Sequence, residues 1–126
     1  MVGNKVQVFN FEAENFKDTI QTPGMLRKEI FADDNCWVGF VQTEPESIGG
    51  WHHHGEYNTF VCVIKGFIII DFGGSNQKSV HGSEGNALFV PKGLIHREKT
   101  PSSEKGLVMV IRVGKGNPVI NVESQG

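Results

Sequence analysis

Three of the chain's five histidines lie side by side in the stretch GGWHHHGEYN, residues 49–58. Successive side chains of a β-strand point to opposite faces, so a strand here would place His52 and His54 on one face and His53 on the other. Two neutral imidazoles on one face are a natural start for a metal site, because imidazole binds Zn, Cu, Fe and Ni. The alternative is a solvated turn that follows the two glycines.

A further histidine, His96, ends the stretch GNALFVPKGLIH, residues 85–96. We expect a strand, a tight turn and a second strand here, because Pro91 restricts φ and Gly93 permits a positive φ. A hairpin closed in this way can bring His96 beside the histidine triplet. On its own, a histidine in such a strand is more often a hydrogen-bonded core or edge residue than a metal ligand.

The elements that must position these histidines are short strands separated by glycine and proline turns. Apolar periodicity predicts strands at residues 5–9, 25–31, 37–43, 59–64, 67–72, 76–81, 86–90, 95–99 and 107–113. Helical spacing is confined to residues 11–20, and the polar tail around Pro118 is expected to add a final edge strand. So many short strands predict an all-β sandwich or barrel.

Composition narrows the class of protein. The chain has 126 residues, of which 38% are hydrophobic and 21% charged, and its formal net charge is −2. We expect a single domain over residues 1–126 that binds neither nucleic acid, which needs a basic face, nor membrane, because the longest apolar run, 67–70, is far too short. The N-terminus lacks the pattern of a signal peptide, and Cys36 and Cys62 form no CxxC, so a cytoplasmic protein with free thiols is expected.

The two histidine stretches resemble the paired signature motifs of the cupin family. The first family motif is G, five residues, H-x-H, three or four residues, E, six residues, G. His52, His54 and Gly66 fit it, although Glu46 stands where the leading glycine belongs. A second motif follows the first in the order that the family has, and the pair makes the resemblance specific.

The second family motif is G, five residues, P-x-G, two residues, H, three residues, N. Gly85, Pro91, Gly93 and His96 fit it, and Thr100 stands at the asparagine position. The resemblance implies an all-β fold, the cupin double-stranded β-helix or jelly-roll barrel.

The resemblance also implies a metal site inside the barrel. Carried over to this sequence, the metal ligands are His52, His54 and His96. The family's glutamate falls at Thr59, so the resemblance gives a three-histidine variant that lacks this carboxylate. Three neutral imidazoles leave the charge of a divalent ion uncompensated, which favours an anionic ligand with two donor atoms.

Three other side chains near the motifs are candidates for a role at this site. Thr59 is expected in the catalytic site, where its hydroxyl can hold a metal-bound water. Glu98 lies two residues past His96, on the same strand face, and is a candidate catalytic base or an unusual ligand. Glu56 can fold back from the presumed turn. For both glutamates, plain solvated charge is the alternative.

The three-histidine variant resembles the cupin dioxygenases that cleave diketones or oxidise thiols with ferrous iron. The resemblance implies an oxygen-dependent oxidoreductase acting on a small chelating anion, with Fe(II) favoured over Zn, Ni, Mn or Cu. Two alternatives stay open, a non-redox metal-dependent isomerase or lyase and a non-catalytic module that binds a small ligand. Cupins often pair through edge strands, so a homodimer is expected by resemblance.

The inner strands would also supply the apolar walls of a substrate cavity, although ordinary core packing is the alternative for each residue. The candidate wall residues are Trp51, Tyr57, Phe60, Phe67, Phe89 and residues 107–111. Arg27 is a candidate for holding a substrate carboxylate if its side chain points inward. His81 is expected at the surface, and Cys62 is out of phase with the ligand face.

Overall fold

The structure is a computed structural model that describes residues 5–9, 25–117 and 119–123. In this part of the chain the secondary structure consists of strands, and no helix there has the length and hydropathy of a membrane span. The strands are β1 (Met25–Ala32), β2 (Cys36–Thr43), β3 (Ser47–Ile48), β4 (His52–His53), β5 (Asn58–Lys65), β6 (Phe67–Phe72), β7 (Lys78–Ser83), β8 (Ala87–Val90), β9 (His96–Thr100), β10 (Gly106–Val113) and β11 (Ile120–Asn121).

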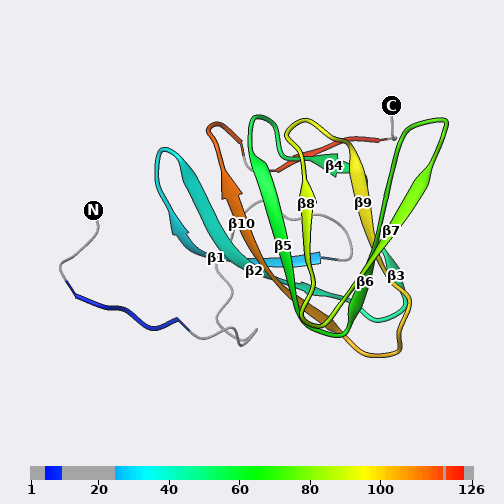
Figure 1. Cartoon of the computed structure of the whole chain (residues 1–126), viewed down its shortest axis with the longest axis horizontal. Coiled ribbons are helices and arrows are strands. Elements are labelled where there is room, and N and C mark those ends of the chain that lie inside the picture. The colour runs from blue at the N-terminus through cyan, green and yellow to red at the C-terminus, as the bar shows by residue number, and fades with distance from the viewer. Residues whose placement is uncertain (1–4, 10–24, 118, 124–126) are drawn as a thin grey trace.

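The strands form two antiparallel sheets that face each other (Figure 1). The first, which we call sheet A, has the order β1-β2-β10-β5-β8. The second, sheet B, has the order β11-β4-β9-β6-β7, and β3 pairs with the last two residues of β9. Neighbours in both sheets are often far apart in sequence, which is typical of a jelly roll and confirms the all-β prediction.

Side chains of β9 and β10 alternate between the core and the outside. In β10, Val108, Val110 and Arg112 are buried, whereas the residues between them are less so. In β9, His96 and Glu98 are buried in the same phase. The apolar core therefore lies between the two sheets, and several polar side chains share the inner face with it.

Eight of the predicted strands are confirmed with small shifts at their ends, and the predicted final edge strand is present as β11, which pairs with β4. The predicted strand at residues 5–9 is wrong. Figure 1 shows this segment lying apart from the sheets, and Val6 and Val8 are 95% and 87% exposed. Its apolar side chains pack against no described sheet, so the alternating pattern alone was not enough to predict a strand. The helical spacing at 11–20 lies outside the described residues, and both cysteines are free, as predicted.

A buried carboxylate on the outer face of sheet B ties three strands together. Asp71, on β6, accepts hydrogen bonds from Ser79 Oγ at 2.6 Å and Arg97 Nε at 3.0 Å, and Lys99 Nζ lies 3.0 Å away. Burial alone would raise the pKa of Asp71, but these three partners hold it below its usual range. The network joins β6 to β7 and β9, the strand that carries His96.

Replacing Asp71 by Asn should therefore lower the free energy of unfolding by about 1–3 kcal/mol at neutral pH, because the charged partners lose their acceptor. The folded-state pKa lies below the unfolded value, so this stabilisation is present above the usual aspartate range and is lost as pH falls through the folded pKa. Urea titrations of both proteins should show a difference that shrinks below about pH 4. A difference that is constant with pH would contradict the assignment.

Candidate metal centre

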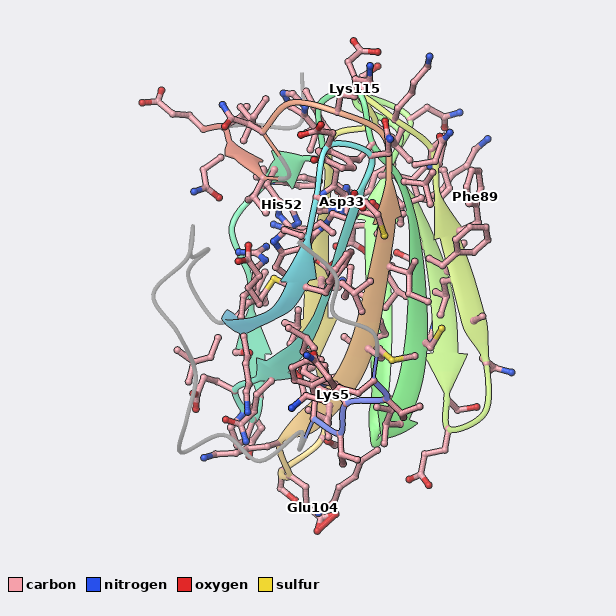
Figure 2. The ribbon with its side chains drawn as sticks, turned by 90° about the vertical axis from the view of Figure 1, so that its left-hand side faces the viewer. Lys5, Asp33, His52, Phe89, Glu104 and Lys115 are labelled. Carbon is pink, nitrogen blue, oxygen red and sulfur yellow. The ribbon has the colours of Figure 1, made fainter. Side chains whose placement is uncertain are left out.

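Three imidazoles converge between the two sheets, near one end of the barrel. His52 on β4 pairs directly with His96 at the start of β9, and His54 follows β4 by one residue. The ring centroids are 4.4, 4.9 and 5.1 Å apart, and one nitrogen of each ring lies within 4.8 Å of the other two. All three side chains are buried, and Figure 2 shows His52 lying inside the ribbon. The motif histidines are therefore brought together as predicted.

Backbone carbonyls set the orientation of two of these rings. Nδ1 of His52 lies 3.0 Å from the carbonyl oxygen of Gly50, and Nδ1 of His96 lies 2.9 Å from that of Leu94. A carbonyl only accepts, so Nδ1 carries the proton and donates it, which leaves the Nε2 lone pair exposed to the cluster. Neither Nε2 atom has a hydrogen-bond partner among the described residues. Buried lone pairs in this arrangement fit a metal ion.

Burial also favours the neutral form that metal binding needs. It lowers the pKa of His52 to about 4, and it lowers that of His54 well below the usual histidine value, with Arg112 as the next cause. Neutral imidazole is the ligand form, so no proton has to be removed at physiological pH.

The middle histidine has a different role. His53 is half-buried on the outer side of β4, and its Nδ1 accepts a hydrogen bond of 3.0 Å from the backbone N–H of Gly55. It therefore supports the turn after β4, as the strand phase predicted for a residue pointing away from the ligands.

Of the two candidate glutamates, only Glu98 lies at the centre. The residue is 6% exposed. Its Oε2 lies 3.5 Å from Nε2 of His52, and its Oε1 lies 3.6 Å from Nε2 of His96. Burial opposes its ionisation, but the neighbouring imidazoles hold its pKa below the usual range. Glu56 is exposed, and its carboxylate lies 3.8 Å from Nζ of Lys92. It is therefore a solvated surface charge, as the alternative interpretation of this residue had it.

Sheet A supplies the opposite wall of the centre. Thr59 on β5 is fully buried, and its hydroxyl has no hydrogen-bond partner in the described part of the chain. A cavity of about 10 Å³ lies beside the cluster, and its lining includes His54, Thr59, Glu98 and Arg112. This volume is close to the minimum that one water molecule needs.

Arg112 is the residue of this site that the sequence analysis missed. It is 1% exposed, its guanidinium lies 4.1 Å from the centre of the Trp37 ring, and Nε and Nη1 have no acceptor among the described side chains. The indole N–H of Trp37 in turn donates to Glu29 at 2.8 Å. The available signal was its phase, because Arg112 shares the inward positions of β10 with Val108 and Val110.

Arg27 is also buried, so its candidate inward orientation is confirmed. Burial lowers the pKa of Arg27 to about 10, against the opposing influence of Glu98, and lowers that of Arg112 to about 9, with Arg27 as the second cause. Both values remain above neutral pH, so two positive charges lie inside the barrel near the imidazoles.

The predicted apolar walls are only partly correct. Tyr57 is buried, but Phe60 and Phe89 are 43% and 54% exposed and contact each other on the outer face of sheet A, with ring centroids 5.2 Å apart. Figure 2 shows Phe89 on the outside. Strand phase is the reason, because Thr59 and Val90 take the neighbouring inward positions.

The remaining side chains named from the sequence lie outside the core. Trp51 is half-buried beneath the guanidinium of Arg97 at 4.5 Å, and Phe67 is half-buried against His81, with ring centroids 6.1 Å apart. His81 is exposed, as predicted. Cys62 lies in the outward phase of β5, so it faces away from the ligands as expected.

Comparisons with known proteins bear on the fold. No protein-family model matches the sequence, and no curated protein matches it. An uncharacterized conserved protein with a double-stranded β-helix domain from Klebsiella pneumoniae subsp. pneumoniae MGH 78578 superposes with a TM-score of 0.75 at 14% identity, over 95% of this chain and all of that one. The Cnp3 cupin domain of Schizosaccharomyces pombe gives 0.65 at 11%, over 77% and 66%. This chain has the cupin fold.

A further structure with this cupin fold is an oxalate oxidase in complex with the substrate analogue glycolate. Its TM-score is 0.71 at 17% identity, over 90% of this chain and 63% of that one. Identities this low establish a shared fold and leave the chemistry to be argued from the site.

Single alanine substitutions should distinguish the proposed metal ligands His52 and His96 from their neighbour His53. His52→Ala and His96→Ala are each expected to abolish metal binding, because each removes a buried lone pair, whereas His53→Ala should leave it near normal. The measurement is metal per chain by elemental analysis, on protein purified without chelators or a histidine tag. Equal losses in all three variants would contradict the strand phase.

Proposed function

We propose that this protein is an oxygen-dependent metal enzyme that acts on a small chelating carboxylate. In this proposal His52, His54 and His96 hold a divalent metal, with Fe(II) favoured and Zn, Ni, Mn or Cu as alternatives. The observation that carries the proposal is the guanidinium of Arg112, which lies buried beside the histidine cluster with two nitrogens that lack an acceptor. Such a group is well suited to bind an oxyanion.

Charge supports an anionic ligand. Arg27 and Arg112 contribute two buried positive charges, and Glu98 offsets one of them. A divalent ion on neutral imidazoles would add two more, so the interior would carry an excess of positive charge. Buried charge of one sign is costly unless it is paired, and a carboxylate on the metal and on Arg112 would pair it.

The size of the cavity supports the smallest substrates. A volume of about 10 Å³ beside His54 and Arg112 holds about one water molecule, so any substrate has to displace neighbouring side chains, and a small anion requires the least displacement. The oxalate oxidase with the same fold binds glycolate as a substrate analogue, and both names denote two-carbon carboxylates. We therefore place oxalate-sized anions ahead of β-diketones as substrates.

Each residue has a distinct role in this proposal. Iron(II), when bound, would supply the one-electron chemistry that reaction with oxygen requires. Arg112 donates two N–H groups to the substrate carboxylate, and stacking on Trp37 fixes the direction of those donors. Thr59 offers its hydroxyl to a small group in the cavity. The buried side chains around the cavity limit the access of water.

A non-catalytic role is the second candidate, and the same cavity favours it. The cavity has space for about one water molecule and no more, which is consistent with a protein that binds a metal and catalyses no reaction. A non-redox isomerase or lyase would instead need a free protein base, for which Glu98 is the nearest carboxylate. Oxygen consumption separates the first function from these two.

A homodimer, a cytoplasmic location and a single domain spanning residues 1–126 remain predictions. A second copy would cover the exposed aromatic pair of Phe60 and Phe89 and the outer edges of sheets A and B, which have no partner strand among the described residues. Sedimentation of the protein at several concentrations would test the dimer directly.

The proposed reaction can be tested by oxygen uptake after anaerobic loading with Fe(II). Oxalate should cause oxygen consumption in the parent protein, and Arg112→Gln should lower kcat/KM about 10- to 100-fold because charge-assisted hydrogen bonds to the substrate are lost. Lys92→Gln, which removes an exposed positive charge, is the matched control and should leave the rate unchanged.

Metal content and circular dichroism of each variant would show that it is folded and loaded, and Arg112→Lys replaces Arg112→Gln if the latter fails to fold. Retention of a metal without any oxygen consumption would exclude the oxidoreductase and favour the second candidate. Equal rates for Arg112→Gln and the parent would remove Arg112 from the substrate site.

A further inference from the structure

We propose that Glu98 is a fourth protein ligand of the metal and replaces, from the opposite sheet, the carboxylate that the cupin motif carries at position 59. This inference rests on the metal-binding part of the proposed function. The ligand set would then be three imidazoles and one carboxylate, with Thr59 left as a cavity residue.

The distances from Glu98 to two of the three imidazoles fit a shared ion. Two ligand atoms that each lie about 2.1 Å from one ion are about 3.0 Å apart at a right angle and about 3.4 Å apart at the tetrahedral angle. The two carboxylate oxygens of Glu98 lie 3.5 and 3.6 Å from Nε2 of His52 and of His96. A small closing movement of the side chain would bring an oxygen to bonding distance.

Hydrogen bonding does not account for these contacts. The distances exceed the length of about 2.7–3.2 Å that an N–H···O bond has in proteins. The carbonyls of Gly50 and Leu94 accept from Nδ1 of His52 and of His96, so both Nε2 atoms present lone pairs. A carboxylate facing two nitrogen lone pairs is repulsive unless a proton or a metal cation lies between them, and a divalent metal can bind both nitrogens at once.

One oxygen of the buried carboxylate is left without a hydrogen bond in the described part of the chain. Oε2 of Glu98 lacks a hydrogen-bond partner among the described residues, and the residue is 6% exposed. A buried unpaired carboxylate would cost several kcal/mol, so a bound cation explains why it is tolerated. The imidazole nitrogens and this oxygen are orphaned in the same place.

Topology explains how one carboxylate can replace the other. His96 and Glu98 are two residues apart on β9, so both side chains point inward. The strand that supplies His96 therefore presents Glu98 to the same space. Thr59 lies on β5 in the facing sheet and lines the same small cavity as Glu98. A carboxylate can therefore reach the cluster from either sheet.

One consequence concerns the reaction. A coordinated Glu98 would compensate one charge of the metal without help from a substrate, unlike a site of three imidazoles alone. It would also be unavailable as a free general base, which argues against the isomerase or lyase alternative.

The direct test is a crystal structure of the unmodified protein loaded with Co(II), with the ion located by anomalous scattering. A Glu98 oxygen about 2.0–2.2 Å from the ion is expected. An ion bound by the three imidazoles with both Glu98 oxygens beyond about 3 Å would overturn the inference while leaving the metal site intact. Protein that takes up no metal would overturn the proposed function as well.

Variants give an independent measurement in solution. Glu98→Gln keeps the shape but removes the charge, and it should weaken Co(II) binding more than about 100-fold in competition with a chromophoric chelator, beyond the usual effect of an outer-sphere partner. The visible Co(II) spectrum should change with it. Parent-like affinity together with a parent-like spectrum would overturn the assignment.

Moving the carboxylate tests the replacement itself. The double variant Thr59→Glu with Glu98→Gln returns the carboxylate to the motif position and should recover at least about tenfold of the lost Co(II) affinity. A folded double variant no tighter than Glu98→Gln would overturn the claim that the two positions are equivalent. Glu104→Gln, far from the cluster, is the control and should bind as the parent does (Figure 2).

Discussion

Burial of ligating and charged side chains between two apolar sheets is the constraint on which this structure depends. Removed from water, an imidazole stays neutral, a carboxylate needs a cation and a guanidinium needs an acceptor. The inner face of the barrel holds all three kinds of group among valine, isoleucine and leucine side chains. Their unmet bonding capacity, rather than any single distance, is the basis for proposing a metal and a small anion there.

The two sheets contribute different groups to the proposed site. Sheet B positions the imidazoles and Glu98, and the outer network around Asp71 holds β9 in place behind them. Sheet A positions Thr59 and the guanidinium of Arg112. Metal ligands therefore come from one sheet and groups suited to an anion from the other, so the relative placement of the sheets sets the geometry of the proposed centre.

The departure from the cupin motif at Thr59 acquires a different meaning in three dimensions. On the sequence alone it removes a carboxylate and leaves a bare three-histidine site. In the structure a carboxylate from Glu98 lies beside two of the imidazoles. The same departure also leaves a small cavity beside Arg112, which limits what could bind. For this reason the proposed substrates are small carboxylates rather than the larger diketones that the resemblance first implied.

The sequence by itself determined most of the strands from residue 25 onward, the cupin fold and the three histidines, because strand periodicity and motif spacing are local properties of the amino-acid order. The two-residue strands β3 and β4 are too short to show a period. Which face each residue takes was predictable where ligands set the phase, as for His53, and failed for Phe60 and Phe89, where aromatic character was mistaken for burial. Only the tertiary structure decided that Glu98 joins the cluster and that Arg112 lies beside it. Glu98 lies beside His52 because β4 pairs with β9 within sheet B, and Arg112 lies beside the cluster because sheet A packs against sheet B. Both contacts join segments that are far apart in sequence, so no local pattern encodes them.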